Sequence, residues 1–142
     1  MNKLLTIFFI LQFIIGHTQC LEGDCKNGKG TYRYEDGSIY KGEWKEGEWI
    51  QGTLTMENGE KREGEFMDDE LNGQGKITYL DGDIDEGEFK GNELNGQGKR
   101  TSEDGHIIEG KFKFGEPYVV NKITYKDGTF YKGKFKIKSF SY

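Results

Sequence analysis

The chain has 142 residues, of which 33% are hydrophobic and 14% aromatic, and its net charge is −5. It contains 22 glycines, one proline and no alanine, so the best helix former is absent and one of the poorest is abundant. This composition excludes a helical bundle and an enzyme built on a thick apolar core. The aromatic content also argues against a disordered chain. A glycine-punctuated, aromatic-rich all-β protein remains.

Residues 1–19 have the pattern of a secretory signal peptide. Lys3 is followed by the apolar run Leu4–Ile15, which is too short to span a bilayer. We therefore predict a helical signal peptide over residues 1–19 and a mature chain that is secreted, periplasmic or held in the cell envelope. A lipoprotein anchor at Cys20 needs small residues before the cysteine, and Gln19 disfavours it.

The only two cysteines are Cys20 and Cys25, and they lie in the segment 20–27, which we interpret as an N-terminal cap. In an oxidising compartment they are expected to form a disulfide that closes a short loop. A zinc site would need further ligands, and His106 is the only histidine outside the leader. We therefore predict no metal and no cofactor.

A repeat of 22–23 residues organises residues 28–138. In each copy an Asp-Gly or Asn-Gly pair is followed five residues later by a glycine, and an aromatic residue stands two positions beyond it. The pairs are Asp36-Gly37, Asn58-Gly59, Asp81-Gly82, Asp104-Gly105 and Asp127-Gly128. The copies span about residues 28–50, 51–72, 73–95, 96–119 and 120–138, and residues 139–142 form a tail.

Each copy predicts one β-hairpin, because Asp-Gly or Asn-Gly between alternating runs is a strong signal for a tight turn with positive φ. Period-2 alternation places Tyr32 and Tyr34 on one face and Arg33 on the other. In the second strand, exemplified by Tyr40–Trp44, the central glycine leaves a gap into which a neighbouring ring can lie.

The pattern resembles the MORN (membrane occupation and recognition nexus) repeat. The hallmark of that family is matched here by Tyr40-Lys-Gly-Glu-Trp44 together with Gly28-Lys-Gly-Thr-Tyr32, and by Tyr131-Lys-Gly-Lys-Phe135 in the last copy. Shorter matches are Glu63-Gly-Glu-Phe66 and Glu86-Gly-Glu-Phe89. The resemblance implies a MORN solenoid, an elongated single-layer antiparallel sheet of about five consecutive hairpins.

Several copies depart from the pattern. The leading tyrosine is replaced by Arg62, Asp85 and Ile108, and Arg100 stands where an apolar residue is expected. These changes interrupt a continuous aromatic face. They indicate either decay of the repeat or a polar notch in which the charges of Arg62 and Asp85 pair across the sheet.

No catalytic constellation can be assembled from the sequence. His106 follows a turn glycine and has no nucleophile beside it in the pattern. The acidic run Asp81, Asp83 and Asp85 begins like an EF-hand loop, but Glu86 and Asn92 stand where that loop needs glycine and glutamate. We expect the protein to be no enzyme.

Charge is unevenly distributed along the mature chain. Residues 20–110 carry −12 and residues 111–142 carry +6. The acidic body excludes nucleic acid as a partner. The last strand alternates lysine with apolar residues, and its basic patch is Lys132, Lys134, Lys136 and Lys138. The patch is either a site for an anionic membrane or an acidic partner, or a device that keeps an open edge from aggregating.

We expect a binding or scaffolding module that recognises a protein partner, or a second copy, through an aromatic sheet face. The reason is that a one-layer sheet has no second layer to cover such a face, which would then line a groove or form an interface. Peripheral binding of anionic lipid through the lysines is the alternative. The predicted face consists of Tyr32, Tyr34, Tyr40, Trp44, Phe66, Tyr79, Phe89, Phe112, Tyr125, Tyr131 and Phe135.

Overall fold

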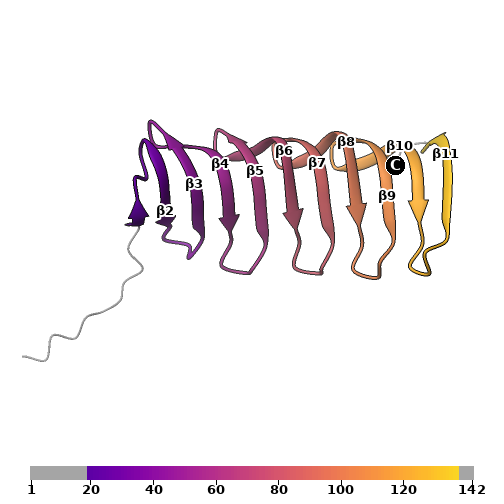
Figure 1. Ribbon diagram of the computed structural model, residues 1–142, viewed down its shortest axis with the longest axis horizontal. Coiled ribbons are helices and arrows are strands. Elements are labelled where there is room, and N and C mark those ends of the chain that lie inside the picture. The colour runs from indigo at the N-terminus through magenta and orange to yellow at the C-terminus, as the bar shows by residue number, and fades with distance from the viewer. Residues whose placement is uncertain (1–18, 138–142) are drawn as a thin grey trace, which may run out of the picture.

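A computed structural model describes residues 19–137 of the chain. The predicted leader (except Gln19), Lys138 and the tail 139–142 lie outside these residues. The described part is one open, elongated sheet of 11 antiparallel strands in sequence order (Figure 1), which confirms the all-β fold of consecutive hairpins. None of its residues form a helix long and apolar enough to cross a membrane.

Each strand pairs with its neighbours in the sequence, so that β1 and β11 form the two edges of the described sheet. The strands are β1 (Gln19–Gly23), β2 (Gly28–Arg33), β3 (Ile39–Lys45), β4 (Glu48–Thr55), β5 (Lys61–Met67), β6 (Glu70–Thr78), β7 (Ile84–Lys90), β8 (Glu93–Thr101), β9 (Ile107–Lys113), β10 (Glu116–Thr124) and β11 (Phe130–Lys136).

The Asp-Gly and Asn-Gly pairs form the turns along one long edge of the sheet, as predicted. Between β2 and β3 the N–H of Tyr34 donates to the carbonyl of Ser38, and the N–H of Gly37 donates to the carbonyl of Tyr34. Only Gly37 of the pair has positive φ, at 83°, so the loop is a tight turn followed by a left-handed glycine. The Asp36 carboxylate accepts the N–H of Ser38 at 2.9 Å, and four later copies repeat this bond.

A second row of turns runs along the opposite edge, and the sequence analysis did not predict it. These are two-residue loops in which both central residues have positive φ, as in Asp68 (53°) and Asp69 (61°). The other three are Glu46-Gly47, Gly91-Asn92 and Phe114-Gly115. Such loops match the twist of the flanking strands and join each hairpin directly to the next.

A row of glycines crosses the sheet from β1 to β9. Each glycine pairs with the glycine of the next strand. We call this row the glycine crease; it consists of Gly23, Gly30, Gly42, Gly52, Gly64, Gly75, Gly87, Gly98 and Gly110. A Cβ added at Gly52 would lie 2.6 Å from the Cα of Gly42 and 2.5 Å from the carbonyl oxygen of Lys41. The backbones therefore approach too closely along this line for any larger residue.

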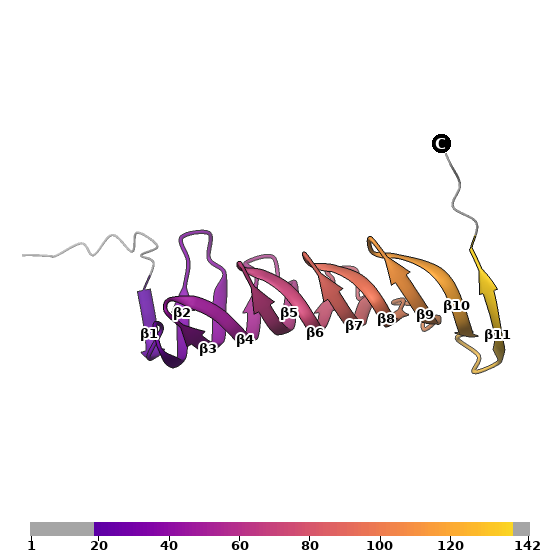
Figure 2. The same cartoon turned by 90° about the horizontal axis from the view of Figure 1, so that it is seen from above.

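The sheet bends at the glycine crease, so that the strand segments on one side of the crease fold back over the inner face of the segments on the other side. Residues 40 and 44 would be about 13 Å apart on a flat strand, yet the rings of Tyr40 and Trp44 are 5.0 Å apart between centroids. Trp49, which pairs with Trp44 across the turn, stacks on Tyr40 at 4.7 Å. Figure 2 shows β4, β6 and β8 curving out of the plane of the sheet.

The bend gives the single sheet an enclosed core, and the expectation of an uncovered aromatic face is wrong for most of its length. Tyr40, Leu71, Ile77, Leu94 and Phe112 are at most 1% exposed. The rings also use the space that the glycines leave, since the hydroxyl of Tyr40 lies against the inner side of the crease. A bent sheet covers its own inner face, which a flat sheet cannot do.

We predict that Gly52→Ala lowers the free energy of unfolding by about 2–3 kcal/mol, because the added methyl group meets backbone atoms of the neighbouring strand that cannot move aside. Gln51→Ala on the exposed outer face is the control and should change the free energy by less than about 0.5 kcal/mol. Urea unfolding followed by tryptophan fluorescence measures both. Equal effects of the two changes would contradict the role of the crease.

Candidate functional site

The residues of the predicted aromatic face divide into three groups by their exposure. Five are buried in the core and hold the bent sheet together, so they are not accessible to a partner. They are Tyr40, Trp44, Phe66, Phe89 and Phe112. Tyr32, Tyr34, Tyr79 and Phe135 are partly buried, and Tyr125 and Tyr131 are exposed. The accessible residues of the face therefore lie along the outer margin of the bent sheet, which we call the rim, and at the C-terminal end of the sheet.

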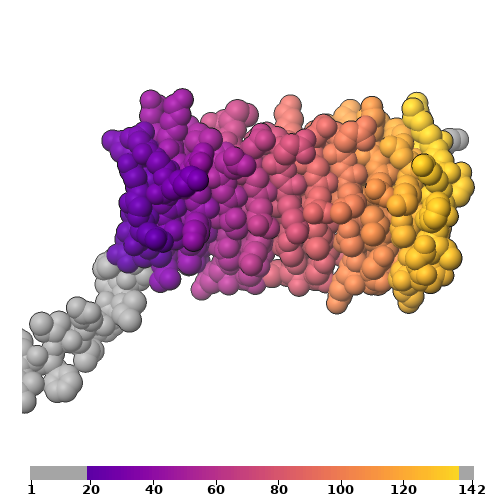
Figure 3. Space-filling model, in the orientation of Figure 1, coloured from indigo at the N-terminus to yellow at the C-terminus, as the bar shows by residue number. Residues whose placement is uncertain are grey.

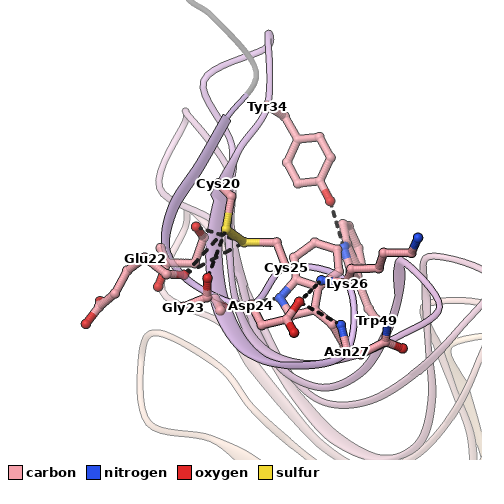
Figure 4. Close-up of a disulfide and its surroundings, with 12 residues drawn as sticks. Cys20, Glu22, Gly23, Asp24, Cys25, Lys26, Asn27, Tyr34 and Trp49 are labelled. Carbon is pink, nitrogen blue, oxygen red and sulfur yellow. Dashed lines mark hydrogen bonds between the residues drawn. A yellow bond between two sulfur atoms is a disulfide. The ribbon is translucent and has the colours of Figure 1, made fainter.

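One hollow of the rim lies near the N-terminal end and has a volume of about 440 Å³. Its apolar wall includes Tyr34, Trp49 and Met56, and Asp36 and Asp69 stand at its edge. The indole N–H of Trp49 donates to the hydroxyl of Tyr34 at 2.7 Å (Figure 4). Burial raises the pKa of Tyr34, and the charges of Asp69 and Asp36 raise it further.

The Cys20–Cys25 disulfide closes the N-terminal end of the sheet (Figure 4), as the sequence predicts. The two Cα atoms are 5.9 Å apart. A hollow of about 580 Å³ near this end is lined by glycine backbone and by side chains of both charges, among them Lys29 and Glu43. Lys29 and Glu43 themselves form an exposed ion pair at 3.5 Å, so this hollow offers no single sign of charge to a ligand.

A buried ion pair interrupts the core between β7 and β8. Asp85 is 1% exposed and lies opposite Arg100, whose Nε and Nη2 each donate to its carboxylate at 2.8 Å. The hydroxyl of Tyr79 donates to the same carboxylate at 3.1 Å, and Arg100 also donates to the carbonyl of Gly115 at 2.9 Å. The Asp85 carboxylate is therefore satisfied by two side chains, that of Arg100 on β8 and that of Tyr79 just after β6.

The expected polar notch is present, but its partners differ from the prediction. Asp85 pairs with Arg100 and not with Arg62, because the strand register places Arg100 directly opposite. Arg62 pairs with Glu60 at 2.8 Å on its own side of the sheet. The hydrogen bond to Asp85 raises the pKa of Arg100. Burial, followed by the charge of Asp85, raises the pKa of Tyr79 to about 12.

The C-terminal end differs from the interior of the sheet because no described strand follows β11. Tyr131 occupies the repeat position of Tyr40, but it is 53% exposed where Tyr40 is 0% exposed. In the interior, the next strand supplies the residues that cover this position, as Leu54 and Trp49 do for Tyr40. Further exposed apolar side chains at this end are Tyr118, Tyr125, Phe130 and Ile137.

The basic patch lies on the same terminal strand. Lys132, Lys134 and Lys136 are exposed and alternate with Tyr131, Gly133 and Phe135. In the described residues, ion pairs join Lys99 to Glu86 and Lys122 to Glu109, whereas these three lysines form none. Positive charge without an ion-pair partner in the described residues and exposed apolar surface therefore meet at one end of the molecule, which is coloured yellow in Figure 3.

The family comparison agrees with this geometry. The MORN repeat model matches residues 26–39, 40–61, 63–84 and 86–107, which is more than half of the chain. The chain belongs to the MORN repeat family. A search of curated proteins finds no matching relative.

MORN repeats are generally modules that bind proteins or membranes, and the family is typically non-catalytic. Two features that could have suggested a metal-dependent reaction have structural roles here. The Asp81 carboxylate accepts the N–H of Asp83 within the turn, and Asp85 pairs with Arg100. The described residues contain no group of three or more His, Cys, Asp or Glu side chains placed to hold a metal ion.

Three features relevant to the candidate site were not predicted from the sequence. Trp49 belongs to the core, and its signal was the apolar residue that recurs after Glu48, Glu70 and Glu93. Tyr118 and Phe130 add to the exposed end, but nothing in the repeat marks them as accessible. The pairing of Asp85 with Arg100 could have been found by aligning the copies, which puts the two residues in opposing strands.

We predict that Arg100→Ile lowers the free energy of unfolding by about 3–5 kcal/mol, because it leaves the Asp85 carboxylate buried without its cation. Replacing both partners, in Asp85→Ile with Arg100→Ile, should recover most of that loss, since isoleucine already stands at the equivalent positions Ile108 and Ile77. Thermal and urea unfolding measure the three proteins. A double variant as unstable as the single one would show that the pair itself stabilises the fold.

We predict that the stability of the fold depends on the ionisation of Tyr79 at alkaline pH. Its pKa in the folded chain, about 12, lies above the ordinary value of 10.0, so the protonated phenol stabilises the fold fully below pH 10. This contribution is lost as the pH rises toward 12. The absorbance of tyrosinate in wild type minus that in Tyr79→Phe should show a midpoint near pH 12 while circular dichroism reports an intact sheet. A midpoint near 10 would contradict the burial of the hydroxyl.

Proposed function

We propose that this MORN protein is a non-catalytic binding module of the secreted or cell-envelope space that recognises a protein partner at its C-terminal end. The observation that carries the proposal is the contrast between Tyr131, which is 53% exposed, and Tyr40, which is fully buried at the equivalent position. Aromatic side chains are enriched in protein interfaces, whose rims are polar and accessible to solvent. Five of the other aromatic residues of the face are buried in the core and are not available to a partner.

The proposed location follows from the leader and the cysteines. Residues 1–19 have the composition of a secretory signal peptide, and disulfides persist in oxidising compartments. Cys20 is bonded to Cys25, so its sulfur is not free for attachment of a lipid. We therefore favour a mature chain that begins near Cys20 and carries no lipid anchor.

Binding to an anionic membrane surface is the second candidate function. It is supported by the three exposed lysines of β11, which form no ion pair among the described residues. Each lysine near such a surface contributes about 1 kcal/mol. The exposed apolar residues Phe130 and Tyr131 could then enter the headgroup region. The two candidates share one end of the molecule and differ in what that end contacts.

A photocrosslinking experiment tests the proposed function. A benzophenone amino acid is placed at position 131 of the chain with its leader, in the cells that produce it. We expect a specific protein adduct from position 131. Position 80 is the matched control, because Leu80 is 63% exposed and lies in a turn far from the C-terminal end. Equal adducts from both positions, or adducts from neither, would contradict the proposal.

Vesicle flotation of the mature chain separates the two candidates. Flotation that requires phosphatidylglycerol and is lost in the triple variant Lys132→Glu, Lys134→Glu and Lys136→Glu would support the membrane candidate. A protein adduct from position 131 without flotation would support the protein candidate.

A further inference from the structure

We propose that β11 accepts an extended acidic segment of a partner protein as a twelfth strand, and that Lys132 selects the charge of that segment. This inference rests on the proposed function, because it names the chemistry by which the partner is recognised. Adding a strand to an exposed sheet edge is a general way to bind a peptide: main-chain hydrogen bonds give affinity and alternate side chains give specificity.

β11 is the edge strand of a repeating structure. It pairs with β10 on one side, and no described strand lies on its other side. Inside the array every second strand of a hairpin is followed by another antiparallel strand, for example β7 by β8. One edge of the β11 backbone is therefore left without a neighbour among the described strands.

The inner face of β11 presents apolar side chains that an incoming strand could cover. In the interior, Phe89 lies opposite Leu94, and both are buried. Phe135 occupies the position of Phe89 but is only partly buried, and Tyr131 is exposed. Gly133 occupies the repeat position of Gly42, and the ring of Tyr131 lies against it as the ring of Tyr40 lies against Gly42. The glycine pairs of the crease end at Gly110, which lies opposite Val120, but Gly133 has no side chain that would keep a further strand away.

The outer face carries a ladder of charges, in which paired residues of neighbouring strands alternate in sign. Glutamate and lysine alternate from strand to strand at directly paired positions: Glu63, Lys76, Glu86, Lys99, Glu109 and Lys122. Among these, Lys99 pairs with Glu86 and Lys122 with Glu109. The alternation requires glutamate on β11, but Lys132 stands there, opposite Lys122. The terminal strand thus presents the opposite charge from the one that would continue the ladder.

The reversed charge defines what can pair with β11. Opposite charges that face each other across strands stabilise the pairing, and like charges destabilise it. A copy of β6, β8 or β10 would place Lys76, Lys99 or Lys122 opposite Lys132. Two copies joined edge to edge through β11 would bring six lysines together. A strand with glutamate or aspartate at this position, and apolar residues opposite Tyr131 and Phe135, fits both faces.

The experiment uses two nine-residue peptides with blocked ends. One has the sequence of β6, Glu-Leu-Asn-Gly-Gln-Gly-Lys-Ile-Thr, and the other differs only in having glutamate in place of its lysine. Fluorescence anisotropy with the mature chain 20–142 measures the dissociation constants. We expect the acidic peptide to bind about 3- to 10-fold more tightly.

Lys132→Glu should reverse the preference, so that the lysine peptide binds more tightly. This variant restores the interior alternation opposite Lys122 and is not expected to impair folding. Lys126→Glu, in the exposed turn before β11, is the matched control for net charge and should keep the wild-type preference. Hydrogen exchange should slow at alternate amides of β11 when the acidic peptide is bound, and should stay unchanged in β1 at the other edge.

Several results would overturn the inference. Equal binding of both peptides, binding of neither at millimolar concentration, or an unchanged preference in Lys132→Glu would each do so. A further variant lacks residues 138–142. If both peptides bind this variant equally, the chain's own tail, and not an acidic partner, is the natural occupant of the edge. A protein adduct from position 131 with no peptide preference would leave the proposed function standing and remove only the acidic strand.

Discussion

The close approach of backbones along the glycine crease is the constraint on which the rest of the structure depends. Nine consecutive strands place a glycine at the same line of the sheet, and the side chains on either side of that line can then meet. The bend converts an alternating pattern, which in a flat sheet would leave one apolar face uncovered, into a closed core. The low hydrophobic content of the chain is sufficient because one layer serves as both walls of that core.

Local sequence signals were enough to predict the repeat period, the hairpins, the first row of turns and the disulfide. These features depend on residues close together in the chain, such as Asp36 and Gly37, and on period-2 alternation. The bend was not predictable in the same way. One glycine in a strand marks a gap, but the consequence of nine aligned glycines depends on register across the whole sheet. The partner of Asp85 also depends on register, which places Arg100 opposite it, and an alignment of the copies, though not one copy alone, contains that information.

The candidate site was predicted in part. The sequence indicated both the aromatic residues and the terminal lysines, but it could not separate core positions from accessible ones, because Tyr40 and Tyr131 occupy the same place in the repeat. Their difference arises from the number of neighbouring strands, which is a property of position in the array. Function in a repeat protein can therefore concentrate at an end, where a side chain that is structural elsewhere remains free.

The disulfide makes the two ends of the array unequal in their resistance to local opening. Because the strands follow one another in sequence order and pair only with their neighbours, local opening of such a sheet starts at a terminus and proceeds strand by strand. At the N-terminal end the Cys20–Cys25 bond restrains β1 beside β2, whereas among the described strands β11 pairs with β10 only. Fraying is thus directed to the C-terminal strands, and anything that pairs with β11 shortens the part of the sheet that opens.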